Sequence, residues 1–345
     1  MALSDIIGQE NAINILKGVI RKNRVPHALI FVGEDGIGKK LTALNFAKAL
    51  NCRNEQSDDL FAIHEEPSAL TGLDTIDNCG VCASCRKIDK GNHPDVIMIA
   101  PEGDGGQITV SVIRELEGSL SYKPYEGKWK IAIIDNADRL NQSAANAFLQ
   151  TLEEPSPASI LILISSRPDR LLPTIRSRCQ RINFSPLPID TMSALIEEKA
   201  GECDKEKSLL LSRLSGGRLG YALNEELIDQ RDRSFDVLIK LLQSREEDLW
   251  DSRDEMEAWF DWCQMWLRDM AVCKATGRAD FLINSDKENE IKSIISGTNL
   301  KDILKLAREM YHIRGKLNFN LNKQLTLNYT GLLLKKSLRK SKAYN

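Results

Sequence analysis

A chain of 345 residues is long enough for two or three domains, since domains of about 150 residues are common. Hydrophobic residues make up 42% of it and charged residues 28%, which excludes a disordered or fibrous protein. The 47 Lys and Arg against 49 Asp and Glu give a formal net charge of -2, so no overall positive field is available to hold a nucleic acid. The apolar runs are far shorter than the ~18 residues of a membrane helix, and the N-terminus does not resemble an export signal. These features predict a cytoplasmic protein that does not span a membrane.

A phosphate-loop motif follows the first short apolar run, residues 27–32, which is predicted to be a buried parallel strand. The motif residues are Gly33, Gly36, Gly38 and Lys39. Backbone N–H groups of such a loop surround phosphate oxygens, while the lysine reaches the outer phosphates. The final position, where a hydroxyl would bind Mg²⁺, holds Lys40, whose ammonium repels a metal ion. The loop therefore either still binds ATP or keeps only the shape of a nucleotide site.

A cluster of cysteines comes next, and the predicted metal ligands are Cys52, Cys79, Cys82 and Cys85. Thiolates in C-x2-C spacing can bind one ion, and four sulfurs complete a tetrahedral structural zinc site with no open position. An iron–sulfur cluster of the bacterial type would need a further cysteine where Asp89 stands. Because an acidic spacer, residues 53–78, separates Cys52 from the other three, His64 and His93 compete with it for the fourth place. We predict structural Zn²⁺ in a module at about 52–95.

A second buried run, residues 131–134, ends at Asp135 in the form of a Walker B strand. A carboxylate in this position faces the phosphate loop and binds Mg²⁺. Relatives of this architecture that hydrolyse ATP carry Glu at the next position, whereas Asn136 can hydrogen-bond a water but cannot accept its proton. Lys40 and Asn136 together argue against hydrolysis in the chain's own site and leave residual ATP binding open.

Buried runs alternate with helical patterns through the first half of the chain. Further runs are found at 96–99 and 160–164, and the clearest helical pattern extends from 143 to 154. This alternation predicts an α/β fold with a parallel sheet covered on both faces. After Pro186 the remaining chain is helical in period, with its strongest helix at 254–273. The aromatic stripe of that helix indicates a core rather than a ligand site.

An arginine-rich segment, residues 176–179, follows the buried run at 160–164 after a loop that contains proline, residues 167–173. Arg178 is one of its two arginines. On such a loop an arginine is either a solvated side chain or an arginine finger, a guanidinium offered to a phosphate in a neighbouring subunit. The residues alone leave both interpretations open.

Taken together, these motifs resemble the delta-prime family of subunits of the bacterial DNA polymerase III clamp loader, which are AAA+ proteins. Besides the phosphate loop and the cysteines, the resembling segments are Ile7–Gln9, His27–Phe31, Gly91–Asp95, Ile131–Asp138, Ala144–Pro155 and Ser177–Cys179. The resemblance is dense up to residue 186. Beyond it the likeness is thinner and includes Leu214–Gly217 and Asn318–Asn320.

The resemblance implies three domains: an AAA+ RecA-like pseudo-ATPase domain at 1–186 with the inserted zinc module, a small helical lid at 187–230 and an all-α collar domain at 231–345. It also implies a heteropentamer with delta and the ATPase subunits gamma or tau, which loads a sliding clamp onto primed DNA. In that family the Ser-Arg-Cys motif supplies the finger, which corresponds to Arg178. Where active AAA+ relatives have a sensor-2 arginine, the counterpart here is Gly220, with Arg218 two residues earlier.

Two other functions stay open at this point. One is an active clamp-loader ATPase of the gamma or tau type, which would hydrolyse ATP alone. The other is a zinc-ribbon protein that binds nucleic acid without ATP, against which the net charge of -2 already argues.

Overall fold

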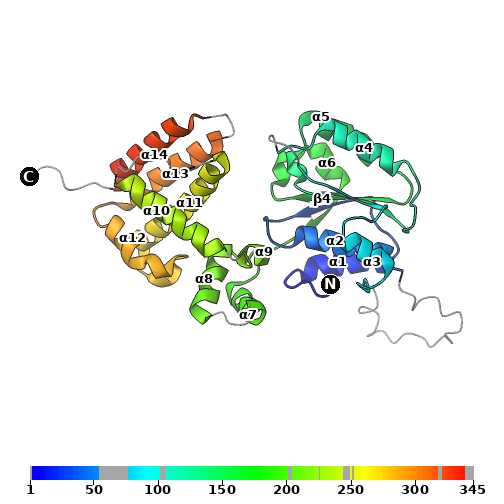
Figure 1. Cartoon of the computed structure of the whole chain (residues 1–345), viewed down its shortest axis with the longest axis horizontal. Coiled ribbons are helices and arrows are strands. Elements are labelled where there is room, and N and C mark those ends of the chain that lie inside the picture. Colours follow the sequence, from blue (N-terminus) through cyan, green and yellow to red (C-terminus); the bar gives the residue numbers. More distant parts are fainter. Residues whose placement is uncertain are drawn as a thin grey trace, which may run out of the picture. The chain divides into compact units, whose positions relative to one another are not determined.

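The structure, a computed structural model, describes residues 2–53, 77–101, 106–200, 204–224, 226–243, 249–250, 252–317 and 321–338. It divides into two compact units (Figure 1). The first contains Met1–Leu187 together with Arg218–Gly220, and the second contains Pro188–Gly217 and Tyr221–Asn345. The acidic spacer and the segment 318–320 lie outside the described residues, apart from the ends of the spacer.

A five-stranded sheet of order β2-β3-β4-β1-β5 forms the centre of the first unit, and all its strand pairs are parallel. The strands are β1 (Ala28–Val32), β2 (Val96–Ile99), β3 (Lys130–Ile134), β4 (Ser159–Ser165) and β5 (Gln180–Asn183). Every residue of β1, β3 and β4 is buried, which is why these strands read as continuous apolar runs. The predicted parallel sheet is confirmed. Sequence analysis missed β5, because only Ile182 of this edge strand is buried.

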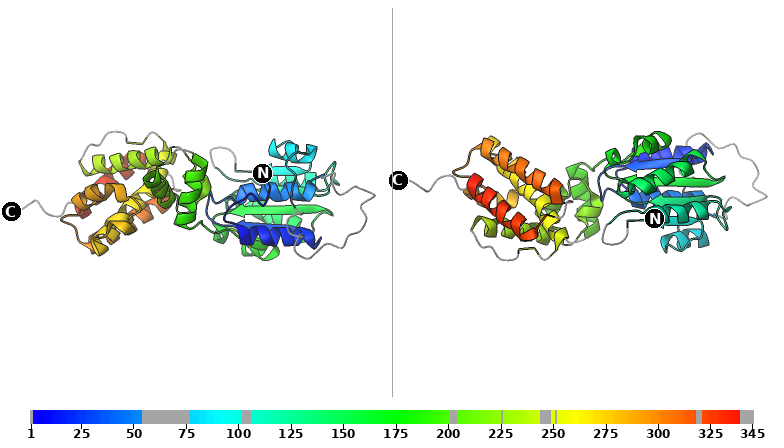
Figure 2. Two further views of the ribbon diagram at one scale, coloured as in Figure 1. Left: turned by 90° about the horizontal axis from the view of Figure 1, so that it is seen from below. Right: turned by 90° about the horizontal axis from the view of Figure 1, so that it is seen from above.

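Helices cover both faces of this sheet (Figure 2), and alternate residues of each strand face opposite helices. Leu29 and Phe31 pack with α1 and α2, whereas Ile30 and Val32 belong to the core with α4, α5 and α6. The helices are α1 (Glu10–Arg21), α2 (Lys39–Asn51), α3 (Ala83–Asp89), α4 (Val110–Leu120), α5 (Gln142–Glu153) and α6 (Pro173–Arg178). The short helix α3 packs against α2, outside the two main layers.

The second unit is helical throughout its described residues. Its helices are α7 (Ile189–Ala200), α8 (Lys205–Ser215), α10 (Leu227–Leu242), α11 (Arg253–Thr276), α12 (Glu288–Ile294), α13 (Leu300–Lys316) and α14 (Lys323–Leu338), while α9 (Leu219–Ala222) lies at the junction with the first unit. The predicted stripe on α11 is a core, since Trp259, Cys263, Trp266 and Met270 are all buried. Both tryptophan indole N–H groups donate to Ser234 of α10. The separation of a lid from a collar at residue 230 stays a prediction.

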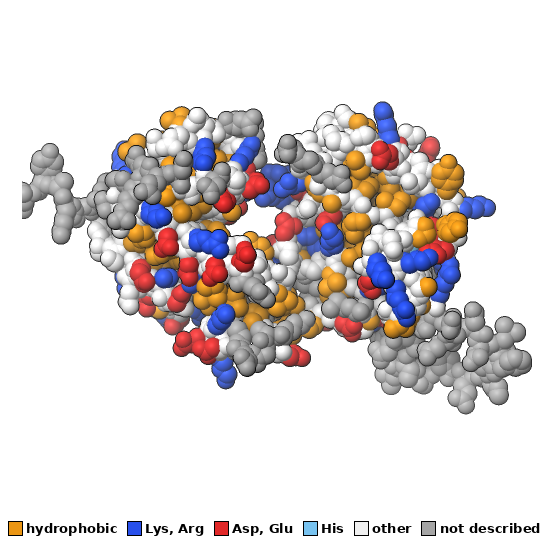
Figure 3. Space-filling view, in the orientation of Figure 1, with side chains coloured by type: hydrophobic (Ala, Val, Ile, Leu, Met, Phe, Trp, Pro, Cys, Tyr) orange, Lys and Arg blue, Asp and Glu red, His pale blue; other side chains and the backbone are white. Residues whose placement is uncertain are grey.

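On the face drawn in Figure 3, basic and acidic side chains of the described residues are interspersed. This distribution agrees with the formal net charge of -2. Among the described helices, none combines the length and the apolar character that crossing a bilayer requires.

Candidate functional site

The phosphate loop connects β1 to α2, as the motif predicts. Gly36 and Gly38 adopt φ values of 77° and 103°, a left-handed region that favours glycine. Gly33 is close-packed, because a Cβ there would lie 2.8 Å from the carbonyl oxygen of Phe184. The loop therefore keeps the backbone shape that surrounds phosphates in nucleotide-binding proteins.

Lys39 at the start of α2 is buried and donates to the loop's own backbone. Its ammonium lies 2.5 Å from the carbonyl oxygen of Gly33 and 2.6 Å from that of Glu34, with the Asp35 carboxylate at 3.5 Å. Burial lowers the pKa of Lys39, and the charge of Asp35 acts in the opposite direction. The lysine thus stabilises the loop without a phosphate.

Lys40 occupies the last position of the phosphate-loop motif, where a hydroxyl would bind Mg²⁺. Its ammonium lies 3.0 Å from the carboxylate of Asp135, which directly follows β3. In a working phosphate-loop site, the hydroxyl at the Lys40 position and the acid at the Asp135 position hold Mg²⁺ together. Here Asp135 forms an ion pair with the ammonium of Lys40.

The residues after β3 are tied to the end of β4. Asn136 takes a left-handed conformation with φ 49°, and its backbone N–H donates to Asp135. Asp138 accepts a hydrogen bond of 2.8 Å from the hydroxyl of Ser165, the last residue of β4. Sequence analysis did not single out Ser165 or Asp138, although both stand at the carboxyl ends of strands, where the sites of parallel sheets lie.

Gly220 approaches the phosphate loop by its backbone. Its N–H donates to the carbonyl oxygen of Gly36 at 3.0 Å, and a Cβ at this position would lie only 2.9 Å from the same oxygen. The neighbouring Arg218 places its Nε 3.7 Å from the carboxylate of Glu34. A longer residue at position 220 would require the loop or this segment to shift.

The four predicted metal ligands, Cys52, Cys79, Cys82 and Cys85, come together with all their sulfur atoms within 4.8 Å of one another. Cys52, at the end of α2, lies 3.5 Å from the sulfur of Cys79. Backbone N–H groups of Cys79, Cys82 and Cys85 donate to cluster sulfurs at 3.3 to 3.5 Å. The cluster can hold a metal ion. His93 instead contacts the hydroxyl of Ser84 and the backbone N–H of Asp95. His64 lies outside the described residues.

The thiols of this cluster are unequal. Burial acts to raise the pKa of Cys79, but the N–H groups of Cys82 and Val81 outweigh it and lower the pKa to about 6. Burial raises the pKa of Cys52 to about 11 and also raises that of Cys85. Several thiolates at this spacing repel one another, so a cation is required to hold them all deprotonated.

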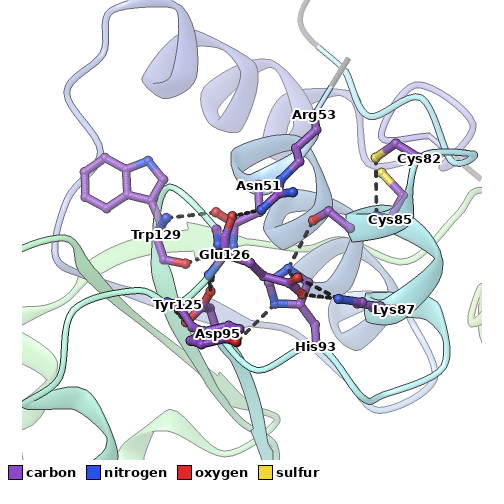
Figure 4. A network of polar contacts seen from close by, with 12 residues as sticks. Asn51, Arg53, Cys82, Cys85, Lys87, His93, Asp95, Tyr125, Glu126 and Trp129 are labelled. Carbon is purple, nitrogen blue, oxygen red and sulfur yellow. Dashed lines mark hydrogen bonds and ion pairs between the residues drawn. The ribbon is translucent and has the colours of Figure 1, made fainter. Parts of the chain in front are cut away.

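A polar network attaches the cysteine module to the sheet (Figure 4). Ser84, between two of the cysteines on α3, lies 3.1 Å from Nε2 of His93. Nδ1 of His93 accepts the backbone N–H of Asp95, so the hydrogen-bond pattern assigns the ring proton to Nε2. Burial lowers the pKa of His93, which keeps the ring neutral. Lys87 of α3 forms an ion pair of 2.6 Å with Glu126.

Asp95 is the fully buried member of this network. Its carboxylate accepts the backbone N–H groups of Tyr125, Glu126 and Gly127 at 2.7 to 2.8 Å. Burial acts to raise the pKa of Asp95, but these three hydrogen bonds outweigh it and lower the pKa. The carboxylate therefore fixes the loop that enters β3.

Replacing Asp95 with Ala should lower the free energy of unfolding by about 3–5 kcal/mol, because three backbone N–H groups lose the buried carboxylate that accepts from them. Asp95→Asn keeps one acceptor oxygen and should lose less. Because the folded pKa lies below the unfolded one, the stabilisation is present above about pH 4 and is lost as pH falls through the folded pKa. Urea unfolding at several pH values checks this, and a difference between wild type and Asp95→Ala that does not shrink in acid would contradict it.

Arg178 is the last residue of α6. The sequence prediction of a loop here is wrong, because Pro173 starts a short helix, as proline does at a first helical position. One guanidinium nitrogen of Arg178 donates to the carbonyl oxygen of Thr174 at 3.1 Å, and another lies 2.5 Å from the carboxylate of Glu153. Arg176 is paired with Asp169 at 3.0 Å. About a third of the Arg178 side chain, 36%, is exposed.

The strand order, the phosphate loop after β1 and the acid after β3 define the class: this is a RecA-like AAA+ domain followed by helices. A family model described as "DNA polymerase III, delta subunit" matches residues 8–188, and one described as "DNA polymerase III, delta subunit, C terminal" matches residues 229–335. The chain belongs to this DNA polymerase III family, and the resemblance to delta-prime subunits seen in the sequence is confirmed.

Similar proteins include two delta-prime subunits. The DNA polymerase III subunit delta' of Bacillus subtilis is 28% identical, over 94% of this chain and 96% of that protein. The delta' subunit of Pseudomonas aeruginosa is 34% identical over 55% of this chain and 53% of its own length. The tau subunit of Escherichia coli is 32% identical over 68% of this chain, which spans 33% of that protein. A gamma subunit-related protein of Thermotoga maritima is a similar solved structure, with 20% identity, coverage of 94% and 99%, and a TM-score of 0.44.

Proposed function

We propose that this chain is the delta-prime subunit of a DNA polymerase III clamp loader, in which it does not hydrolyse ATP itself. In this role it joins the ATPase subunits gamma or tau and the delta subunit in a heteropentamer. It offers Arg178 to ATP bound by a neighbouring subunit while the complex loads a sliding clamp onto primed DNA. The ion pair between Lys40 and Asp135 carries this proposal.

Three features of the chain's own site support the absence of hydrolysis. Lys40 neutralises the acid that would bind Mg²⁺. Asn136 lacks a basic group that could accept a proton from water. Gly220 has no side chain and contacts the phosphate loop through its backbone, so it cannot act as the sensor-2 arginine. These features also argue against the alternative of an active gamma-like or tau-like ATPase.

An exposed apolar stripe on α14 supports assembly with partner subunits. Leu325, Tyr329 and Leu332 are 69%, 48% and 64% exposed, and their spacing of four and three places them on one face of the helix. Large exposed apolar side chains grouped in this way are typical of protein interfaces.

The cysteine cluster fits Zn²⁺ best among metal ions. Four thiolates in a tetrahedral set match structural zinc, and the cluster leaves no ligand position for a substrate. Bound Zn²⁺ would supply the positive charge that the four sulfurs need, and it would thereby fix α3 and the network around His93 and Asp95. Because this network connects the module to the chain's own core, we assign the zinc a structural role rather than one in nucleic-acid binding.

Lys40→Thr should raise the affinity for ATP in the presence of Mg²⁺ by at least about tenfold, because it removes the ammonium and restores a hydroxyl ligand. Lys40→Met, which removes the charge but supplies no ligand, should gain less. Titration with a fluorescent ATP analogue, with and without Mg²⁺, measures the affinity of each variant. Hydrolysis should stay absent in both variants because Asn136 remains. Rapid Mg²⁺-dependent ATP turnover by the isolated wild-type chain would exclude the proposed role.

Arg178→Ala should lower the ATPase rate of the reconstituted, DNA-stimulated complex by about 10³-fold at the one ATP site that it completes, as loss of an arginine finger does. The nearby Arg176→Ala is the matched control, and it should leave the rate near that of wild type because it removes an arginine paired with Asp169 while the arginine of the Ser-Arg-Cys motif remains. If the Arg178→Ala complex assembled normally and hydrolysed ATP at the wild-type rate, Arg178 would not be a finger.

The purified chain should contain about one zinc ion per molecule, and Cys52→Ser should release it at a lower chelator concentration than wild type. Elemental analysis after dialysis measures the zinc content, and a chelator titration measures the concentration at which zinc is released. Cys273→Ala, which changes a buried cysteine of α11 outside the cluster, serves as the control and should keep its zinc. Retention of zinc by Cys52→Ser with unchanged chelator resistance would show that Cys52 is not a ligand.

A further inference from the structure

The guanidinium of Arg178 has a defined orientation in this chain without any partner subunit. The carbonyl oxygen of Thr174, one turn earlier on α6, accepts from one nitrogen at 3.1 Å. The carboxylate of Glu153, at the end of α5, accepts from the other terminal nitrogen at 2.5 Å. These two bonds engage two of the five N–H groups of the guanidinium, so donors are left for a phosphate.

The two helix ends that carry this ion pair are held together by a buried core. Phe148 and Leu152 of α5 and Ile175 of α6 belong to the same apolar cluster, and each is at most 2% exposed. Helices α5 and α6 also pack directly against each other. Glu153 therefore offers its carboxylate from a rigid base rather than from a flexible loop.

Helix α5 gains no stability from having a glutamate at position 153. A negative charge at the C-terminus of a helix lies beside the negative end of the helix dipole, which is unfavourable. Glu153 is the last residue of α5, and the exposed Glu154 follows it directly. The ion pair with Arg178 offsets this unfavourable placement for Glu153, whereas Glu154 forms no ion pair with any of the described residues.

We propose that Glu153 is a positioning residue for Arg178. It holds the guanidinium in the orientation that reaches the phosphate of the neighbouring subunit, and it limits the rotamers that must be fixed when the subunits meet. This inference rests on the proposed function of Arg178. The proposed effect of Glu153 is on the orientation of the guanidinium and not on its charge, because the carboxylate reduces the net positive charge of the pair.

The test uses the complete complex, reconstituted with each variant of this chain and assayed for DNA-stimulated ATP hydrolysis. Glu153→Ala should lower kcat for the dependent site by about tenfold, with KM for ATP changed little, because the neighbouring subunit still binds the nucleotide. Glu153→Gln keeps an acceptor oxygen and should retain most of the activity. Glu154→Ala, the matched control, should behave like wild type.

Further measurements separate positioning from a structural role. The thermal midpoint and the assembly of the Glu153→Ala complex should stay close to those of wild type, since the pair is partly exposed. In an Arg178→Ala background, Glu153→Ala should cause no further loss.

The inference and the proposed function fail in different ways. If Arg178→Ala lowers kcat but Glu153→Ala matches Glu154→Ala, the finger stands and the positioning role is wrong. A rise in kcat for both Glu153 variants would show instead that the carboxylate competes with phosphate, which also overturns the inference. If Arg178→Ala itself leaves kcat unchanged, the proposed function is wrong.

Discussion

All strands of the first unit run in the same direction, so their carboxyl ends meet along one edge of the sheet. This constraint brings the loop after β1, the acid after β3 and Ser165 of β4 to one place, although they are far apart in the sequence. This edge carries the phosphate-loop motif and the acid after β3, and Lys40 and Asp135 form an ion pair there. In the proposed function, the same sheet keeps its shape while the chain acts on a neighbouring subunit from another surface, the end of α6.

The parts of the fold that depend on burial were predictable from the sequence. Strands β1, β3 and β4 are buried on both faces, so each appears as a continuous apolar run. Strand β5 lies at the edge, where three of its four residues stay exposed, and a polar run of this kind gives no strand signal. Helix α6 was predicted as a loop, because a short helix of six residues that begins at Pro173 is too brief for a periodic pattern.

The candidate site was predictable where one motif contains all the relevant residues. The phosphate loop and the three clustered cysteines have fixed local spacing, and Asp135 follows a recognisable strand. Contacts between distant residues were not predictable in this way. The acceptance of three N–H groups by Asp95 and the pairing of Glu153 with Arg178 both depend on tertiary packing. Periodicity and spacing contain no information about such pairs.

The close approach of Gly220 to Gly36 also bears on how this chain can change over time. A substitution that added any side chain at position 220 would first have to move the phosphate loop away from a contact of 2.9 Å. Under the proposed function, a hydrolytic centre in this chain would require changes at 40, 136 and 220 together, and the change at 220 has a steric cost before it has any benefit. The backbone contact between Gly220 and Gly36 therefore favours the retention of glycine at position 220.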